Sequence, residues 1–449
     1  MRFASRADPT HAVSFREALF TGLAPDGGLY HPVESPKLAG LFSSFDDSTS
    51  FAELSCRTFA GILSPELTEA EVSGIVAAAF SFAPVLRRLD DQMLLLELFH
   101  GPTCAFKDFG AQFMAASMEH FLGETDRRIQ ILVATSGDTG SAVAHAFFRR
   151  RGIDVVLLYP SGRVSELQEK QLTTLGGNVH ALEVTGNFDD CQRLVKDAFR
   201  DPRLRKRLRL TSANSINIGR LLPQSLYYVF AATRREQIAV GGGGPAGRGA
   251  AGGAPVICVP SGNFGNLTAG VYAWHWGLPV SSFVAATNAN DIVPRYLATG
   301  QFIPRPSART LSNAMDVGNP SNFERLEDVF RRDWRDMATR IHGIAVSDDR
   351  TLQTMADVHQ TRGFLVDPHT AVGIAAAKSA VEADLVHGAQ IIVLSTAHPG
   401  KFAETVLKAT GKSPQLPDRL AACLRLPRQS VRIGTAFAEL SDYLIANFA

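Results

Sequence analysis

Lys107 is the residue of this sequence whose type and position could do covalent chemistry. It stands in the stretch ELFHGPTCAFKDFGAQF (residues 97–113), just inside the start of an expected helix whose apolar residues Phe109 and Phe113 recur at helical spacing. The positive end of a helix and burial both lower the pKa of a lysine and leave a neutral amine that can attack a carbonyl, as a Schiff-base lysine must. The alternative is a solvated lysine beside Asp108.

Two loops that combine glycines with hydroxyl or amide side chains could bind anions. TSGDTGSA (residues 135–142) and SGNFGN (residues 261–266) each follow an expected strand and precede an expected helix. In the first loop, hydroxyls would surround the helix N-terminus: Ser136, Thr139 and Ser141. Backbone amides at such a helix end hold a carboxylate or a phosphate. Each loop alone could be a capped connection, but two loops at the carboxyl ends of strands favour ligand binding.

A third strand end and one further loop offer more polar groups. In IIVLSTAHPGKF (residues 391–402), Ser395 and Thr396 would present hydroxyls at the same edge of the sheet, where a hydroxyl could hydrogen-bond a ring nitrogen. TSANSINIGR (residues 211–220) carries donors suited to a second anion: Asn214, Ser215 and Arg220. Both segments could instead be ordinary helix starts. Together with Lys107 and the two anion loops, they indicate pyridoxal phosphate and a phosphorylated amino-acid substrate.

The composition favours a cytoplasmic protein that acts on small molecules. The chain has 449 residues and a formal net charge of +1, which gives no electrostatic reason to expect nucleic acid or an acidic membrane surface as a partner. The five cysteines are scattered, odd in number and without metal-ligand spacing, which indicates a reducing compartment and neither a disulfide framework nor a metal site. No stretch has the apolar length of a signal peptide or of a membrane-spanning helix.

Short apolar runs that alternate with helical patterns predict an α/β fold with parallel sheets. Residues 1–88 are predicted as a mostly helical N-terminal domain, and residues 89–212 as a smaller α/β lobe that carries Lys107. Residues 213–449 are predicted as a larger α/β lobe that carries the SGNFGN loop. The Gly/Ala-rich stretch 241–253 cannot pack a core and is predicted as a flexible insertion in the larger lobe.

Seven separated motifs resemble those of the threonine synthase family: HGPT-x-AFKD, ATSGDTG, SANSIN, PSGNFGN, GNPSNFER, DPHTAVG and STAHP-x-KF. They follow in this order over nearly the whole chain and match the bacterial and fungal branch with a large N-terminal domain. The resemblance implies a two-lobed pyridoxal-phosphate enzyme of fold type II, similar to the tryptophan synthase β subunit, with helices on both faces of its sheets. It also implies conversion of O-phospho-L-homoserine and water to L-threonine and phosphate, the last step of threonine biosynthesis.

The same resemblance assigns roles to the candidate residues. Lys107 would form the Schiff base with the cofactor, and Thr396 would face the pyridine nitrogen. The cofactor phosphate would lie in a loop of four residues: Gly262, Asn263, Phe264 and Gly265. The substrate carboxylate would meet a second group: Ser136, Asp138 and Thr139. The substrate phosphate would be held by a third: Asn214, Ser215 and Arg220. Asn266 stands where many relatives have aspartate, so a charge-dependent role at that position is not expected.

Two alternative functions share much of this pattern. A threonine-synthase-like phospholyase would act on the same substrate and release 2-oxobutyrate. A non-catalytic protein would keep the fold and a phosphate site to bind a phosphorylated metabolite. The intact AFKD lysine favours an enzyme, and the sequence leaves the oligomeric state open.

Overall fold

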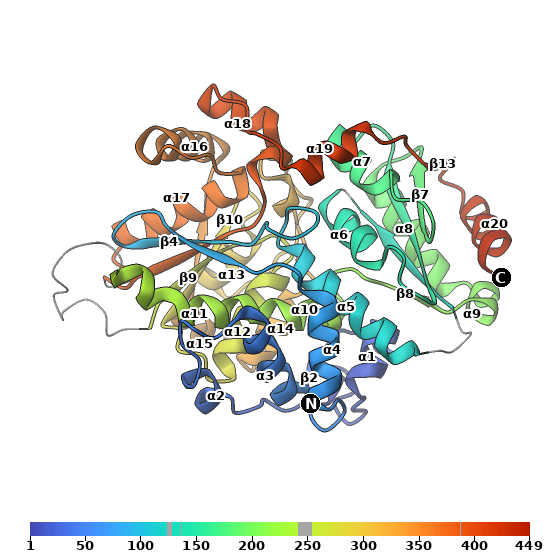
Figure 1. The fold of residues 1–449 in the computed structure, drawn as a ribbon, viewed down its shortest axis with the longest axis horizontal. Coiled ribbons are helices and arrows are strands. Elements are labelled where there is room, and N and C mark those ends of the chain that lie inside the picture. The colour runs from blue at the N-terminus through green and yellow to red at the C-terminus, as the bar shows by residue number, and fades with distance from the viewer. Residues whose placement is uncertain (124–127, 136, 241–253, 387) are drawn as a thin grey trace.

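The computed structural model describes residues 1–123, 128–135, 137–240, 254–386 and 388–449. The stretch 241–253, predicted as an insertion, lies outside these ranges. The predicted α/β fold is confirmed: two sheets form separate lobes, and helices of the N-terminal region lie beneath them in the view of Figure 1. No helix among the described residues is long and apolar enough to cross a bilayer.

A six-stranded sheet forms the larger lobe and is parallel except for its edge strand β3. Its strands, in spatial order, are β11 (Ile341–Ala345), β10 (Ser282–Thr287), β9 (Val256–Pro260), β12 (Ile391–Ser395), β4 (Met93–Glu97) and β3 (Val85–Arg88). Alternate residues of β9 enter two different cores, with Cys258 on one face and Val259 on the other. Because both faces are buried, the central strands are continuous apolar runs.

Helices cover both faces of this sheet. On the face of Cys258 lie α16 (Asp348–Arg362), α17 (Pro368–Glu382) and α18 (Ala403–Thr410). The opposite face is covered by α11 (Ser225–Val240), α12 (Gly265–His275), α13 (Ile292–Thr299), α14 (Phe323–Val329) and α15 (Trp334–Arg340). This arrangement is the one expected for parallel strands joined by crossover helices.

A five-stranded, fully parallel sheet forms the smaller lobe. Its strands, in spatial order, are β13 (Ser430–Ile433), β7 (Val179–Val184), β6 (Ile153–Pro160), β5 (Ile129–Ala134) and β8 (Leu210–Thr211). One face packs on α5 (Lys107–Leu122), α6 (Asp138–Phe147) and α7 (Glu166–Thr173). The other face packs on α8 (Phe188–Arg200), α9 (Pro202–Arg207) and α20 (Phe437–Phe448).

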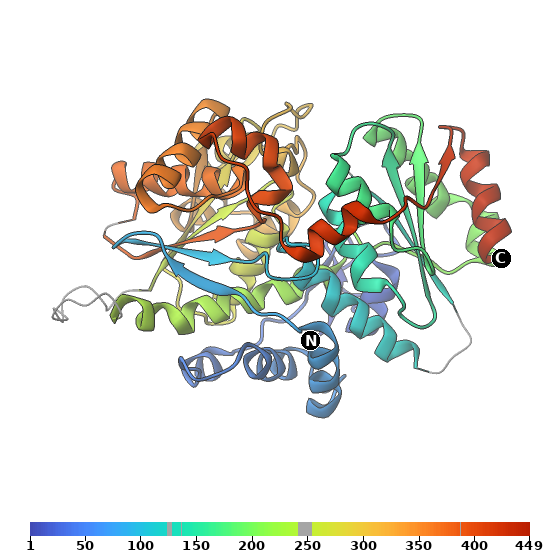
Figure 2. The same ribbon diagram turned by 45° about the horizontal axis from the view of Figure 1, so that its top comes forward.

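The chain crosses between the lobes at two places that the proposed domain boundaries do not mark. Strand β4 lies within residues 89–212 yet pairs with β12 in the larger sheet. Strand β13 lies within residues 213–449 yet pairs with β7 in the smaller sheet, after helix α19 (Asp418–Arg425) has carried the chain across (Figure 2). Because β4 ends in one lobe and α5 begins in the other, Lys107 stands at their junction. The three-domain division itself stays a proposal.

The N-terminal region supports the helix that begins with Lys107. It consists of β1 (Phe3–Ser5), α1 (Phe15–Thr21), β2 (Tyr30–Pro32), α2 (Ala39–Ser43), α3 (Phe51–Leu63) and α4 (Glu69–Ala79). The ring of Phe59 on α3 stacks on that of Phe113 on α5, with 4.3 Å between ring centroids. Both rings are fully buried in a core that the N-terminal region shares with the two lobes.

Arg325 on α14 ties this region to the lobes. Its guanidinium is fully buried and donates to the carbonyl oxygens of Tyr30 on β2 (3.0 Å) and Ile216 (2.8 Å), and to Oδ1 of Asn322 (2.7 Å). Replacing Arg325 with methionine keeps the apolar volume but leaves these buried oxygens without a hydrogen-bond donor. Each buried group left unsatisfied lowers the free energy of unfolding by about 1–3 kcal/mol. We expect the free energy of unfolding, measured in urea, to fall by about 3 kcal/mol.

Arg6→Met is the matched control for this prediction. Arg6 also joins the N-terminal region to α14, through Glu327 at 3.1 Å, but both side chains are about a quarter exposed. Such partly solvated pairs contribute about 1 kcal/mol or less. Equal losses of stability in the two variants would contradict the proposed role of Arg325.

Candidate active site

A cleft of about 1570 Å³ gathers the predicted site residues from both lobes. Its lining includes Lys107, Asp138, Thr139, Asn214, Ser215, Arg220, Gly262, Asn263, Phe264, Gly265 and Thr396. Ser136 is the one predicted site residue that lies outside the described part of the chain. Residues 20–27 of the N-terminal region also line this cleft. The tertiary structure therefore brings together segments that are far apart in the sequence.

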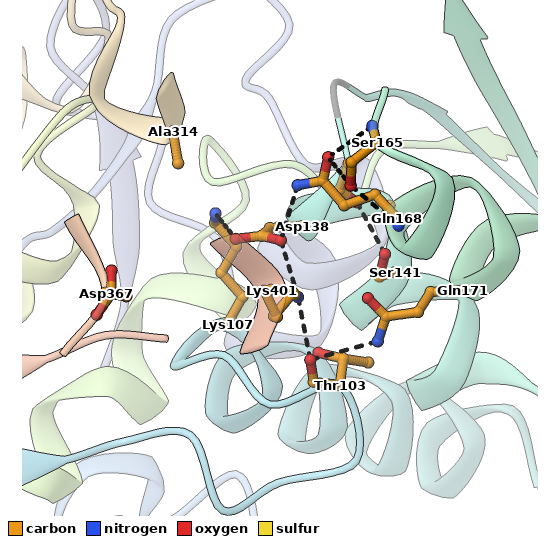
Figure 3. A network of polar contacts seen from close by, with 12 residues as sticks. Thr103, Lys107, Asp138, Ser141, Ser165, Gln168, Gln171, Ala314, Asp367 and Lys401 are labelled. Atoms are coloured by element: carbon orange, nitrogen blue, oxygen red, sulfur yellow. Dashed lines mark hydrogen bonds and ion pairs between the residues drawn. The ribbon is translucent and has the colours of Figure 1, made fainter. Parts of the chain in front are cut away.

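Lys107 is the first residue of α5, as the sequence predicted. Its side chain is 16% exposed, and its Nζ lies 3.7 Å from Oδ2 of Asp138 (Figure 3). Burial lowers the pKa of Lys107, the cations of Lys401 and Arg220 lower it further, and Asp138 opposes them. The structure does not support the solvated alternative, because the side chain is largely buried and lines the cleft, and the lowered pKa increases the fraction of neutral, nucleophilic amine.

The loop before Lys107 folds around the carboxyl group of Asp108. Thr103 donates its backbone N–H (2.9 Å) and its hydroxyl (2.7 Å) to the two oxygens of this fully buried group. Burial raises the pKa of Asp108 to about 6. Gly101 is packed so closely that an added Cβ would lie 2.5 Å from Oδ2 of Asp108. The glycine and the threonine of the HGPT motif therefore fix the start of α5.

The SGNFGN loop is a tight turn between β9 and α12. Phe264 adopts the left-handed conformation (φ 63°), which turns the backbone into the first residue of α12, Gly265. Asn266 braces the turn: its Nδ2 donates to the carbonyl of Pro260 (2.8 Å), and its Oδ1 accepts from the hydroxyl of Ser261 (3.2 Å). Asn266 thus holds the loop with neutral hydrogen bonds. The arrangement leaves a helix N-terminus, which suits an anion, in the cleft.

The TSGDTG segment differs from prediction in where its helix starts. Helix α6 begins at Asp138, three residues before the predicted start at Ser141, because the hydroxyl of Thr135 accepts the backbone N–H groups of Gly137 (3.0 Å) and Gly140 (2.8 Å). This places Asp138 against two lysines, with Oδ1 2.8 Å from Nζ of Lys401. Burial would raise the pKa of Asp138, but Lys401 and Lys107 outweigh burial and lower it.

The SANSIN segment places a buried cation in the cleft. The sequence after this segment predicts one helix from about residue 218 to 233. The structure divides it into α10 (Ile218–Leu221), a 3₁₀ turn η1 (Leu222–Gln224) and α11, because Pro223 supplies no N–H. Arg220 on α10 is 2% exposed and donates to the carbonyl of Ala213 (2.8 Å), while its buried Nε has no partner among the described residues. Burial lowers the pKa of Arg220 to about 10, so the group stays cationic at neutral pH.

The two hydroxyls at the end of β12 differ in their contacts. Among the described residues, only the hydroxyl of Ser395 makes a hydrogen bond within the larger lobe. It lies 3.0 Å from the hydroxyl of Thr370, which in turn donates to Asp367. Thr396 lines the cleft, and its carbonyl accepts the N–H of Phe106 (2.8 Å), next to Lys107. The residue predicted to face a ring nitrogen therefore lies beside the lysine.

Three site residues were missed from the sequence: Gln168, His369 and Lys401. Gln168 donates from Nε2 to Asp138 (3.3 Å), and His369 bridges the N–H of Ala314 (3.2 Å) and Oδ1 of Asp367 (2.8 Å). Lys401 stands in the STAHP-x-KF motif. Gln168 follows Ser165 by three residues, a spacing that predicts a capping box, so both segments could be recognised from the sequence. Their partners are distant in the sequence, and no local pattern identified them.

Comparison with known proteins matches the chain to described families over most of its length. A family model described as pyridoxal-phosphate dependent enzyme matches residues 84–397. The models described as threonine synthase N terminus and threonine synthase, C-terminal match residues 2–80 and 370–444. Threonine synthase of Serratia marcescens is 42% identical over 445 residues, with 99% of each chain covered. Threonine synthase of Escherichia coli is 42% identical over 453 residues, again with 99% of each chain covered.

Solved structures agree in fold. The crystal structure of threonine synthase from Escherichia coli superposes with a TM-score of 0.87 at 40% identity, covering 99% of this chain and 100% of that chain. The structure of threonine synthase with bound pyridoxal phosphate from Brucella melitensis superposes with a TM-score of 0.89 at 34% identity, covering 100% and 99%. A tomato threonine deaminase shares the fold alone, at 14% identity and a TM-score of 0.55.

Proposed function

The chain belongs to the threonine synthase family, and on that premise we propose how its residues convert O-phospho-L-homoserine and water to L-threonine and phosphate. The protein is a pyridoxal-phosphate-dependent lyase of fold type II that acts in threonine biosynthesis. We assign covalent attachment of the cofactor to Lys107. The observation that carries this assignment is a largely buried amine at a helix start, in the same cleft as the SGNFGN loop.

The residues of the cleft fit pyridoxal phosphate. The left-handed turn at Phe264 leaves the backbone amides of residues 262–265 at the N-terminus of α12, which suits the cofactor phosphate. Lys107 offers a neutral amine to the aldehyde, and Thr396 offers a hydroxyl to the ring nitrogen. When bound, the cofactor supplies a ring that draws electrons away from the substrate Cα. A hydroxyl partner leaves the ring nitrogen without the full charge that a carboxylate would stabilise.

Lys107 performs the proton transfers in the proposed mechanism. As a neutral amine it removes the proton from the substrate Cα, and the transfer is favoured because burial and two nearby cations disfavour a resting ammonium. A proton then leaves Cβ, phosphate leaves from Cγ, and the proton taken from Cβ is returned at Cγ. Water adds its hydroxyl at Cβ and gives its proton to the released phosphate. Lys107 returns the first proton to Cα, which gives threonine.

Two anion sites orient the substrate for these steps. We assign the substrate phosphate to Arg220, Asn214 and Ser215, since Arg220 presents a buried cation whose Nε has no partner among the described residues. We assign the substrate carboxylate to Ser136, Asp138 and Thr139, of which Asp138 and Thr139 stand in the first turn of α6. Asp138 contributes its backbone N–H there, because its own carboxylate is held by two lysines and would repel a second one.

Product analysis tests the function against its alternatives. The purified protein, incubated with pyridoxal phosphate and O-phospho-L-homoserine, is expected to release threonine and phosphate in equal amounts. Release of 2-oxobutyrate and ammonia would identify a phospholyase instead. Binding of the substrate without any product would identify a non-catalytic protein. We also propose that the protein works in the cytoplasm, because all five cysteines are free thiols.

Gly262 gives a prediction on cofactor affinity. A Cβ at this position would lie 2.7 Å from the Cα of Met315 and 3.0 Å from the carbonyl of Ala314, so the neighbouring backbone would have to move. Such overpacking costs about 1–3 kcal/mol. We expect Gly262→Ala to bind pyridoxal phosphate about 10- to 100-fold more weakly, measured by quenching of tryptophan fluorescence.

Gly265 in the same loop provides the control. Its nearest neighbour for an added Cβ is Nδ2 of Asn322 at 3.4 Å, an ordinary contact, and alanine is favourable at a helix start. Gly265→Ala is therefore expected to keep its cofactor affinity within about threefold. Equal loss in both variants would mean that the loop rejects any side chain and that the contact with Met315 is not the cause.

A further inference from the structure

A second buried lysine, Lys401, has been assigned no proton transfer and no contact with substrate or cofactor. It lies in the 3₁₀ turn η3 (Pro399–Phe402), and its side chain is fully buried. Its Nζ is 2.8 Å from Oδ1 of Asp138 and donates to the carbonyl of Thr103 at 3.0 Å (Figure 3). A lysine side chain is rarely buried unless its amino group is paired. The contacts with Asp138 and Thr103 therefore account for the burial of Lys401 beside Lys107.

Asp138 lies between two lysines but pairs mainly with one. Its Oδ1 is 2.8 Å from Lys401, whereas its Oδ2 is 3.7 Å from Lys107. Lys401 also has a second acceptor, the carbonyl of Thr103, at 3.0 Å. Asp138 still favours the ammonium form of Lys107, but it shares its charge with the nearer Lys401. It therefore stabilises that ammonium less than an unshared carboxylate would.

Neighbouring amides hold this pair in place. Oε1 of Gln168 accepts from the N–H and the hydroxyl of Ser165 in the capping box of α7, so its Nε2 points to Asp138 at 3.3 Å (Figure 3). Gln171 donates to the same Thr103 carbonyl that Lys401 uses, at 3.3 Å. The pair is thus braced by α7 and by the loop that leads into α5.

The other titratable groups near Lys107 do not replace Asp138 as a counter-ion. Arg220 on α10 is a cation. Burial lowers the pKa of His145 on α6 to about 4, which leaves that group neutral. His369 at the start of α17 accepts the N–H of Ala314 at Nε2 and contacts Oδ1 of Asp367 through Nδ1, so both of its ring nitrogens are engaged by other groups. Asp108, on the helix of Lys107 itself, is bound by Thr103.

We propose that Lys401 is a positioning residue for Lys107: by holding Asp138 in an ion pair, it weakens the stabilisation that this carboxylate gives to the ammonium form of Lys107. A larger fraction of the Lys107 amine is thereby neutral and able to bind an aldehyde and to accept a proton. This inference rests on the proposed covalent role of Lys107.

The pH dependence of cofactor capture tests the proposal without relying on turnover. Full-length protein freed of cofactor is mixed with pyridoxal phosphate at a series of pH values, and the borohydride-reducible bond is measured by absorbance and by mass. In Lys401→Met, Asp138 becomes available to Lys107, so the pH at half-maximal capture rate is expected to rise by about 1–2 units. Lys401→Arg keeps the ion pair and is expected to retain the wild-type midpoint.

Variants of Asp138 keep the test decisive even if Lys401→Met does not fold. Asp138→Asn removes the only carboxylate that the structure places within ion-pair distance of Lys107 and leaves the Lys401 cation, so its midpoint is expected to fall. The double variant removes both charges and is expected to return close to wild type. A uniform loss of rate at every pH, or a higher midpoint in Asp138→Asn, would overturn the proposal. Reducible cofactor in Lys107→Ala would instead overturn the role of Lys107.

Discussion

Lys107→Ala is expected to lose threonine formation by at least about 10⁴-fold, the largest effect of any single substitution in this chain. In the proposed mechanism the residue supplies both the covalent attachment of the cofactor and the proton transfer at Cα. The other lysine that lines the described part of the cleft, Lys196, is exposed on α8. Lys401 is fully buried and paired with Asp138, so it cannot take over. The measurement is threonine and phosphate release together with the visible absorbance of bound cofactor.

Two further variants separate this role from a loss of charge or of structure. Lys107→Arg keeps a cation at the helix start but offers no neutral amine, so it is expected to be as inactive as Lys107→Ala. Lys408→Ala changes an exposed lysine on α18 and is expected to leave the activity unchanged. Normal cofactor absorbance in Lys107→Ala would show that another residue forms the attachment.

Arg220→Met is expected to reduce kcat/KM for O-phospho-L-homoserine by about 10³-fold, or about 4 kcal/mol. Arg220 is 2% exposed, and its Nε is buried without a partner among the described residues. The guanidinium can therefore donate a hydrogen bond to a bound anion. Removing it leaves the substrate phosphate without its main counter-charge. Without substrate, the affinity for pyridoxal phosphate at high pH is expected to be unchanged, because the cofactor loop is a separate element. At lower pH, capture is expected to be slower, because the lost cation no longer lowers the pKa of Lys107.

Arg209→Met provides the control for this prediction. Arg209 is exposed and lies on the same cleft, where solvent screens its charge, so the change in kcat/KM is expected to stay within about threefold. Weaker cofactor binding in Arg220→Met, with unchanged substrate affinity, would reassign Arg220 to the cofactor phosphate. Thermal unfolding of both variants checks that the lost hydrogen bond to Ala213 has not opened the fold.

Much of the site was predictable because its parts are local in the sequence. Helical spacing after Lys107 predicted the helix start that carries it, and the glycine turns after β5 and β9 predicted two helix N-termini at strand ends. Serine with glutamine three residues later predicted the capping box of α7. Each of these features depends on side chains and backbone within one turn or one strand, so the amino-acid order by itself determined them.

The tertiary structure determined which segments that are distant in the sequence lie side by side. Strand β4 joined the larger sheet although it precedes the helix of the smaller lobe, and β13 returned to the smaller sheet from the far end of the chain. The buried pair of Lys401 and Asp138 arises from these crossings. Strand pairing and burial depend on which sheet edges and cavities are available in the folded chain. These are set by contacts between residues far apart in the sequence, so no local pattern predicts them. The sequence by itself determined which residues could react, and only the packed fold decided which of two lysines lines the cleft and which is fully buried in an ion pair with Asp138.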